Sequence, residues 1–399
     1  MPNFRPTDRL TGYLMPPSVE GWLPQRHLAR FIVEVVDGLD LSAMSKSYRG
    51  TGSASYHPAT LLGLLVYGCA TGVFSSRKLE RATYDSVAFR FIAANDHPDH
   101  DTIAAFRRRF LKEIEALFVQ VLLLAREMGV LKMGTVALDG TKIHANASRH
   151  SALSYEHAGK IEAQLKAEVA DLLAKLAARA AKAEATGKKP GGKPPQPPTE
   201  GPLPTDQVNL TDAESRIMPV AGGGFEQCYN AQAVVAAESL LVVAAHVVRA
   251  PNDKQQLAPM LDKIDSLPEE LGEVENLLAD NGYFSEANVK ACEATGIEPS
   301  IAMGRQPHHP TLDERFAEAP PPPENPTPVE AMAHRLKTLE GKKLYGLRKQ
   351  IPEPVFGIIK SVLGFRQFLL RGLEKVRGEW SLVTMSWNLK RMFVLRATG

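Results

Sequence analysis

Two apolar segments in distant parts of the chain each run into an aspartate that a glycine follows closely. The first is Val136-Ala137-Leu138-Asp139-Gly140, and the second is Leu277-Leu278-Ala279-Asp280-Asn281-Gly282. Short apolar runs that end in turn-forming residues are typical of buried strands. A carboxylate at such a place avoids unpaired burial by turning outward at the edge of the sheet. We therefore expect strands that carry Asp139 and Asp280 to a sheet edge, with a tight turn at Gly140 before a second strand over 141–145.

The first third of the chain has another pattern. Residues 1–24 are expected to form an extended arm, whereas the apolar residues of 25–131 recur at helical spacing and predict a helical domain. Pro58 suits a first helical turn, Ser75 or Ser76 suits a cap, and Asp101 suits the cap of a helix that continues toward Met128.

Basic residues gather on two of these helices. They are Arg77, Lys78, Arg107 and Arg108. Side chains of this kind can lie against a phosphate backbone, so we expect a DNA-binding surface here. For any single one of them, a solvated helix face is the simpler alternative.

Residues 132–399 alternate between strand and helix patterns, which favours a mixed sheet with helices on its faces. Within this region, residues 149–208 are expected to be an insertion, with an Ala/Lys-rich amphipathic helix over 156–185 and a Pro-rich linker over 186–204. Strands are expected over 229–237 and 240–249. Asn252-Asp253 is expected to cap the next helix, residues 305–329 to form a loop, and residues 330–399 to be helical.

A third carboxylate, Glu353, opens a short amphipathic helix in this last region. Pro354 fits its first turn, and its expected buried stripe is Val355, Ile358, Ile359 and Val362. Glu353 and Lys360 are expected to share a face. Three converging carboxylates can hold two divalent cations for phosphoryl transfer, and hard oxygen ligands suit Mg²⁺ or Mn²⁺. The alternatives are an ordinary turn aspartate before glycine and a surface ion pair between Glu353 and Lys360.

The charge of the chain is balanced, with 47 basic and 45 acidic residues and a formal net charge of +2 among 399 residues. A DNA-binding surface must therefore be local. Three widely spaced cysteines form no CxxC pair, which fits a reducing cytoplasm. The apolar runs are too short to span a bilayer, so no membrane partner is expected.

Several motifs together resemble bacterial insertion-sequence transposases of the DDE class, the group with the YREK signature. They are VALDGTKIHANAS at 136–148, FEQCYNAQAVV at 225–235 and LLADNGYFS at 277–285, followed by Tyr345, Arg348, Glu353 and Lys360. The N-terminal segments YHPATLLGLLVYGCATGVFSSRKLE and DHDTIAAFRRRF are similar to the N-terminal domain of that family. Four residues separate Arg348 from Glu353, where the usual signature has three.

The resemblance implies an α/β fold of the ribonuclease H-like type, with an N-terminal helical domain and helical and Pro-rich insertions. It implies DNA cleavage at terminal inverted repeats and strand transfer to target DNA. Asp139, Asp280 and Glu353 would bind two Mg²⁺ or Mn²⁺ ions, and Tyr345, Arg348 and Lys360 would contact DNA. A homodimer on DNA, at the bacterial nucleoid, would follow. Two alternatives are another ribonuclease H-like nuclease, such as a junction resolvase, and a non-catalytic DNA-binding protein derived from a transposase.

Overall fold

A computed structural model describes residues 18–48, 54–154, 156–167, 207–220, 222–304, 321 and 323–396. Most of the expected arm over 1–24, the Pro-rich linker over 186–204 and most of the 305–329 loop lie outside these residues.

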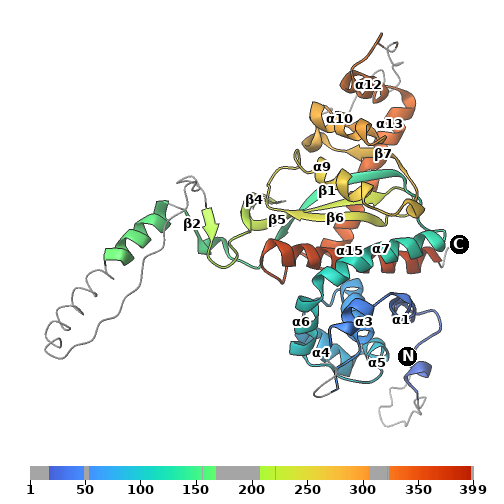
Figure 1. The fold of residues 1–399 in the computed structure, drawn as a ribbon, viewed down its shortest axis with the longest axis vertical. Coiled ribbons are helices and arrows are strands. Elements are labelled where there is room, and N and C mark those ends of the chain that lie inside the picture. The colour runs from blue at the N-terminus through green and yellow to red at the C-terminus, as the bar shows by residue number, and fades with distance from the viewer. Residues whose placement is uncertain are drawn as a thin grey trace, which may run out of the picture.

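A mixed sheet forms the centre of the described part of the chain (Figure 1). Its strands are β1 (Gly134–His144), β4 (Arg216–Pro219), β5 (Phe225–Ala236), β6 (Val242–Val248), β7 (Val274–Ala279) and β8 (Glu298–Ile301). β1 pairs with β5 antiparallel and with β7 parallel; β6 pairs with β5 antiparallel, and β8 with β7 parallel. Antiparallel strands on one side of β1 and parallel strands on the other confirm the expected mixed sheet of an α/β fold.

The first strand differs from the expectation, because β1 continues through Gly140 without a turn. Gly140 pairs with Gln232, and the register with β5 is unbroken from Val136 to His144. The twelve-residue strand β5 gives β1 a partner along its whole length, and this pairing outweighs the local turn preference of Asp-Gly. Asp139 therefore lies within a strand, and only Asp280 follows the end of one.

Helices cover the sheet and connect its strands. α9 (Leu257–Asp265) precedes β7, α10 (Glu286–Ala294) precedes β8, and α12 (Pro328–Arg335), α13 (Leu339–Gly346) and α14 (Pro352–Gly357) follow. The long α15 (Leu373–Arg396) closes the described chain. Trp380 and Trp387 are buried on α15.

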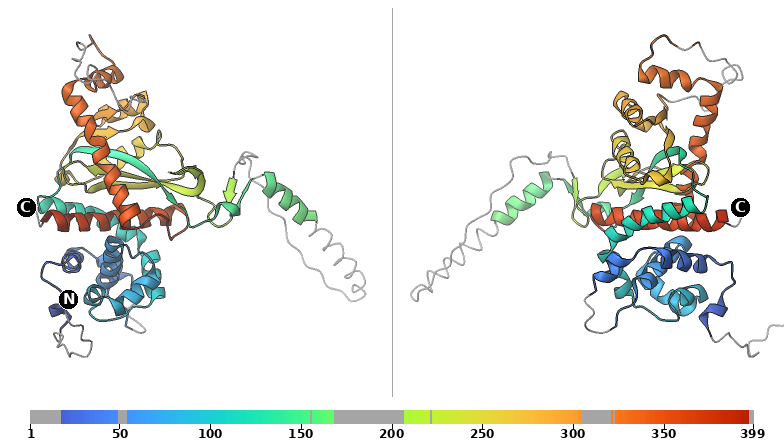
Figure 2. Two further views of the ribbon diagram at one scale, coloured as in Figure 1. Left: turned by 180° about the vertical axis from the view of Figure 1, so that it is seen from behind. Right: turned by 45° about the vertical axis from the view of Figure 1, so that its right-hand side comes forward.

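The N-terminal region is helical, as expected, and its helices before α7 lie on the far side of α15 from the sheet (Figures 1 and 2). Its elements are η1 (Val19–Trp22), α1 (Leu28–Gly38), α2 (Ser42–Lys46), α3 (Pro58–Thr71), α4 (Ser76–Asp85), α5 (Val87–Ile92), α6 (His100–Arg109) and α7 (Leu111–Glu127). α7 runs beside α15 under the sheet (Figure 1). Pro58 is in the first turn of α3, and Ser75 is at the N-cap position of α4.

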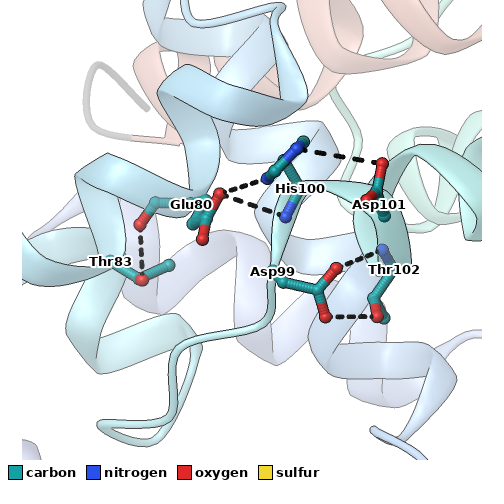
Figure 3. Close-up of polar contacts among 6 residues, drawn as sticks. All are labelled: Glu80, Thr83, Asp99, His100, Asp101 and Thr102. Carbon is teal, nitrogen blue, oxygen red and sulfur yellow. Dashed lines mark hydrogen bonds and ion pairs between the residues drawn. The ribbon is translucent and has the colours of Figure 1, made fainter.

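The start of α6 corrects another expectation (Figure 3). Asp99, not Asp101, is the cap: its Oδ1 accepts a hydrogen bond from the Thr102 N–H at 2.8 Å. The neighbouring His100 contacts Glu80 on α4, with 2.7 Å between Nδ1 and Oε2. The helix also ends at Arg109, and α7 begins a new helix after Phe110. The sequence pattern alone did not show this break because both helices bury apolar residues at similar spacing.

The insertion begins with β2 (Ala152–Ser154), which pairs with β3 (Gln207–Asn209) away from the main sheet (Figure 2). Residues 156–167 are helical, which covers the described part of the helix expected over 156–185. Among the described helices, none alone is long and apolar enough to cross a membrane. The consecutive helices α3 and α4 together have the length and composition of a membrane span, but the chain bends by 95° between them.

Candidate active site

Asp139 and Asp280 lie next to each other because β1 and β7 are parallel neighbours. Ala137 pairs with Leu278, and the two aspartates stand two residues further along each strand. Each carboxylate binds the backbone of its own loop or strand. Asp139 Oδ1 accepts from the Gly140 N–H at 2.8 Å, and Asp280 Oδ1 accepts from the Gly282 N–H at 2.8 Å. The parallel pairing therefore brings together two carboxylates that are far apart in the sequence.

Arg348 connects Glu353 to this pair. One guanidinium nitrogen lies 3.9 Å from Asp139 Oδ2, and the other lies 3.5 Å from Glu353 Oε1. The Arg348 side chain is only 12% exposed, whereas Glu353 is 51% exposed. Glu353 and Pro354 are in the first turn of α14, as the sequence predicts, and Pro352 begins the helix. Thus the third expected carboxylate comes to the same edge of the sheet, on the other side of an arginine.

The other two members of the YREK pattern also lie here. Burial raises the pKa of Tyr345, and Arg348, Asp280 and Asp139 all act on its hydroxyl electrostatically. The Lys360 ammonium donates to the Thr141 hydroxyl at 3.0 Å and to the Lys142 carbonyl at 3.2 Å. These bonds hold α14 and the following turn against β1.

The expected buried stripe after Glu353 is partly wrong. Val355 and Ile359 are fully buried, but Val362 is 72% exposed. A π-helical turn, η6 (Ile358–Val362), follows α14. Its wider turn changes the direction of each side chain that follows, and helical spacing from the sequence does not account for this.

Burial raises the pKa of Asp139 to about 7. The Gly140 N–H and Arg348 oppose this increase, whereas the negative charges of Asp280 and Asp253 add to it. The site therefore holds an excess of negative charge that lacks full compensation from the protein itself.

The donor chemistry of this site fits a hard divalent cation, because its ligands would be carboxylate oxygens from three separate elements. The three carboxylates lie in the same region, but their oxygens do not converge on a single position for a cation. No group of three or more His, Cys, Asp or Glu residues within the described ranges has the arrangement of a metal site. Mutual repulsion keeps such carboxylates apart, and the positive charge between Asp139 and Glu353 belongs to Arg348.

A fourth carboxylate in the site, Asp253, was expected to cap a helix. Instead α9 begins at Leu257 with Gln256 as its N-cap, and Asp253 accepts hydrogen bonds from Asn230 and Gln232 on β5. Lys142 on β1 lies 3.7 Å away. The sequence held one signal: the apolar pattern of the helix starts at Leu257, too far along the chain for Asp253 to be its cap.

The basic residues expected to bind DNA divide into two groups. Arg77, Lys78 and Arg108 are exposed on α4 and α6. Arg107 is only 8% exposed; it donates to the Phe74 carbonyl at 3.2 Å and lies 4.0 Å from Glu379 on α15. Arg107 therefore lies inside the protein, and we exclude it from the DNA-binding surface.

Comparisons with known families agree with this geometry. Residues 17–109 match the family described as "Transposase domain (DUF772)", and residues 202–389 match the family described as "Transposase DDE domain". The chain carries a transposase DDE domain. The second matched segment includes Asp253, Asp280, Glu353 and Lys360, whereas Asp139 lies between the two segments.

A solved structure similar to the transposase is described as "Mos1 transposase paired-end complex with left transposon end". The two sequences are 12% identical, and the match covers 80% of this chain and 82% of the other, with a TM-score of 0.20. No curated protein matches the transposase. The family assignment therefore depends on the two domain matches.

Proposed function

We propose that the transposase cuts DNA at the terminal inverted repeats of a mobile element and joins the freed 3′ ends to target DNA. Asp139, Asp280 and Glu353 are the proposed ligands of two divalent cations, Mg²⁺ or Mn²⁺. The observation that carries this proposal is the convergence of these residues from β1, the end of β7 and α14 at one edge of the sheet, with Arg348 between Asp139 and Glu353.

Bound divalent cations would supply a more acidic attacking water and neutralise charge on the leaving oxygen. In the cleavage step, the water oxygen forms a bond to phosphorus, the bond to the 3′ oxygen breaks, and that oxygen takes a proton. In the joining step, the freed 3′ hydroxyl loses its proton and forms a bond to a target phosphorus, the bond from that phosphorus to the target's 3′ oxygen breaks, and this oxygen takes a proton and leaves as a 3′ hydroxyl. The protein holds the reacting groups in line.

The basic side chains of the site would hold the DNA phosphates. The Lys360 ammonium has three N–H donors and uses two of them on Thr141 and Lys142, so one remains for a phosphate. Arg348 can turn to a phosphate once cations neutralise Asp139 and Glu353. Arg77, Lys78 and Arg108 would bind DNA outside the site, and a dimer would hold both ends of the element.

The test uses a labelled oligonucleotide duplex that carries the element end and the variants Asp139→Asn, Asp280→Asn and Glu353→Gln. We expect each variant to lose cleavage by about a thousandfold, because each removes a negative ligand of the cations. Each should still bind the duplex in a gel-shift assay. The matched control is Glu340→Gln on α13, an exposed glutamate, which should cleave normally.

Three results would contradict the proposal. Full cleavage activity in the Glu353→Gln variant would show that Glu353 is not a ligand of the cations. A wild-type protein that binds element ends without any Mg²⁺-dependent nick would be a non-catalytic DNA-binding protein. Cleavage of branched DNA without joined products would instead favour a junction resolvase.

A further inference from the structure

Asp253 has two oxygens in different surroundings. Oδ1 accepts hydrogen bonds from Asn230 Nδ2 at 2.7 Å and from Gln232 Nε2 at 2.8 Å, and Lys142 Nζ lies 3.7 Å away. Oδ2 accepts no hydrogen bond from any residue in the described part of the chain. One oxygen is therefore fixed firmly by β1 and β5, and the other is left available.

The free oxygen and the second aspartate of the site both lie near Gly282. A Cβ built on Gly282 would lie 2.9 Å from Asp280 Oδ1 and 3.7 Å from Asp253 Oδ2. A Cβ built on Gly140 would lie 2.8 Å from Asp253 Oδ1. The glycines that follow Asp139 and Asp280 thus leave the space into which Asp253 extends.

A buried, unpaired oxygen lies beside the same carboxylate, on its Gly140 side. Asn230 is fully buried, and its Oδ1 has no hydrogen-bond partner among the described residues. This atom lies 3.0 Å from the Cβ position of Gly140, next to Asp253 Oδ1. An amide oxygen left without a donor is costly, and a cation or its bound water removes that cost.

We propose that Asp253 is a fourth carboxylate of the active site and binds a divalent cation together with Asp280. The inference rests on the proposed function, because it assigns Asp280 to the same cation. Two neighbouring carboxylates repel, and a hard cation between them converts that repulsion into binding. Lys142 balances the charge only at Oδ1, which leaves Oδ2 for the metal. A purely structural ion pair of Asp253 with Lys142 is the competing explanation.

The experiment measures Mn²⁺ binding to the full-length, DNA-free protein by the electron paramagnetic resonance signal of free Mn²⁺. The variants are Asp253→Asn, Asp280→Asn and the control Asp262→Asn, an exposed aspartate on α9. Asn keeps an acceptor oxygen for Asn230 and Gln232 but has no charge. We expect the apparent Kd for Mn²⁺ to rise about tenfold or more in Asp253→Asn and Asp280→Asn, and to stay unchanged in Asp262→Asn.

A melting experiment separates metal binding from a structural role. In EDTA, Asp253→Asn should melt close to the wild type, whereas the rise in Tm that Mn²⁺ gives the wild type should be largely lost. Unchanged Mn²⁺ affinity in Asp253→Asn overturns the inference. Cleavage retained by Asp280→Asn overturns the proposed function instead.

A second variant keeps the test valid if Asp253→Asn does not fold. Lys142→Met removes the cation that competes for Asp253 and leaves the carboxylate intact. Metal binding by Asp253 predicts at least threefold tighter binding of Mn²⁺, on the order of the effect of removing one nearby charge. Unchanged or weaker binding in Lys142→Met would contradict it.

Discussion

At the scale of single residues, the candidate active site contains a carboxylate, Asp139, whose ionisation is unfavourable in the folded protein. Asp139 pairs with Ala233 of β5, and β1 pairs with β7 as far as Ala137, so the backbone holds Asp139 close to Asp280. Its side chain is 18% exposed, and burial raises its pKa to about 7. Residues that a site requires often cost stability, because their surroundings serve binding and not folding.

Asp139→Asn should therefore stabilise the DNA-free protein in EDTA above about pH 7. The pKa of Asp139 is about 7 in the folded protein and 3.8 in the reference state, so the folded form holds a proton between these values that the unfolded chain has lost. Stability falls as pH rises through this window, by about 4 kcal/mol in total. Asn has no such cost.

The measurement is the Tm of both proteins at roughly pH 4.5 and pH 8. The two should differ little at the lower pH, and the variant should melt higher at the upper one. A variant that melts lower than the wild type at the upper pH would show that the Asp139 carboxylate is not destabilising.

At the scale of elements, α15 packs closely against α7, and a glycine allows that contact. A Cβ built on Gly378 would stand 2.7 Å from the Leu111 Cβ, an atom fixed to the α7 backbone. Two helices approach this closely only where one side chain is missing.

Gly378→Ala should destabilise the protein by about 1–3 kcal/mol, because overpacking outweighs the gain in helix propensity. The matched control is Gly357→Ala on α14, where a Cβ would meet nothing within 4 Å. That control should be stabilised by up to about 1 kcal/mol. Urea denaturation of both variants gives the comparison, and equal stabilisation by both would mean that α7 and α15 can move apart freely.

At the scale of the whole molecule, α15 joins the helical region to the sheet, since it packs against α7 and α3 as well as β6. A buried charge pair crosses this contact: Arg107 on α6 lies 4.0 Å from Glu379 on α15. Glu379 also accepts backbone hydrogen bonds from Leu369 and Leu370, and burial raises its pKa. The regions over 25–131 and 132–399 therefore share one core across α15.

Arg107→Met should lower the free energy of unfolding by about 3 kcal/mol, because it leaves Glu379 buried without its counter-charge. Exposed Arg108→Met should change it by less than about 0.5 kcal/mol. Conversely, Arg108→Met should weaken DNA binding. Chemical denaturation and gel-shift titration measure the two effects. A strong loss of DNA affinity with normal stability in Arg107→Met would return Arg107 to the DNA-binding surface.

Much of this architecture follows from local pattern. Apolar runs predicted β5, β6 and β7, and Glu353 followed by Pro354 predicted the start of α14. The order of strands and helices was enough for the fold class. The bounds of individual elements were less certain, as Phe110 and the π-helical turn after Ile358 show, because small changes in helix geometry leave no clear sign in residue spacing.

The sequence by itself proposed Asp139, Asp280 and Glu353 as ligands for metal-dependent chemistry, from their local patterns together with the resemblance to DDE transposases. Only the tertiary structure decided how these acids are arranged, that Arg348 lies between two of them, that Arg107 is buried and that Asp253 joins the site. The physical reason is that strand pairing and helix packing bring distant residues together. The local sequence around a charged residue does not show which distant residue it will contact in the folded protein.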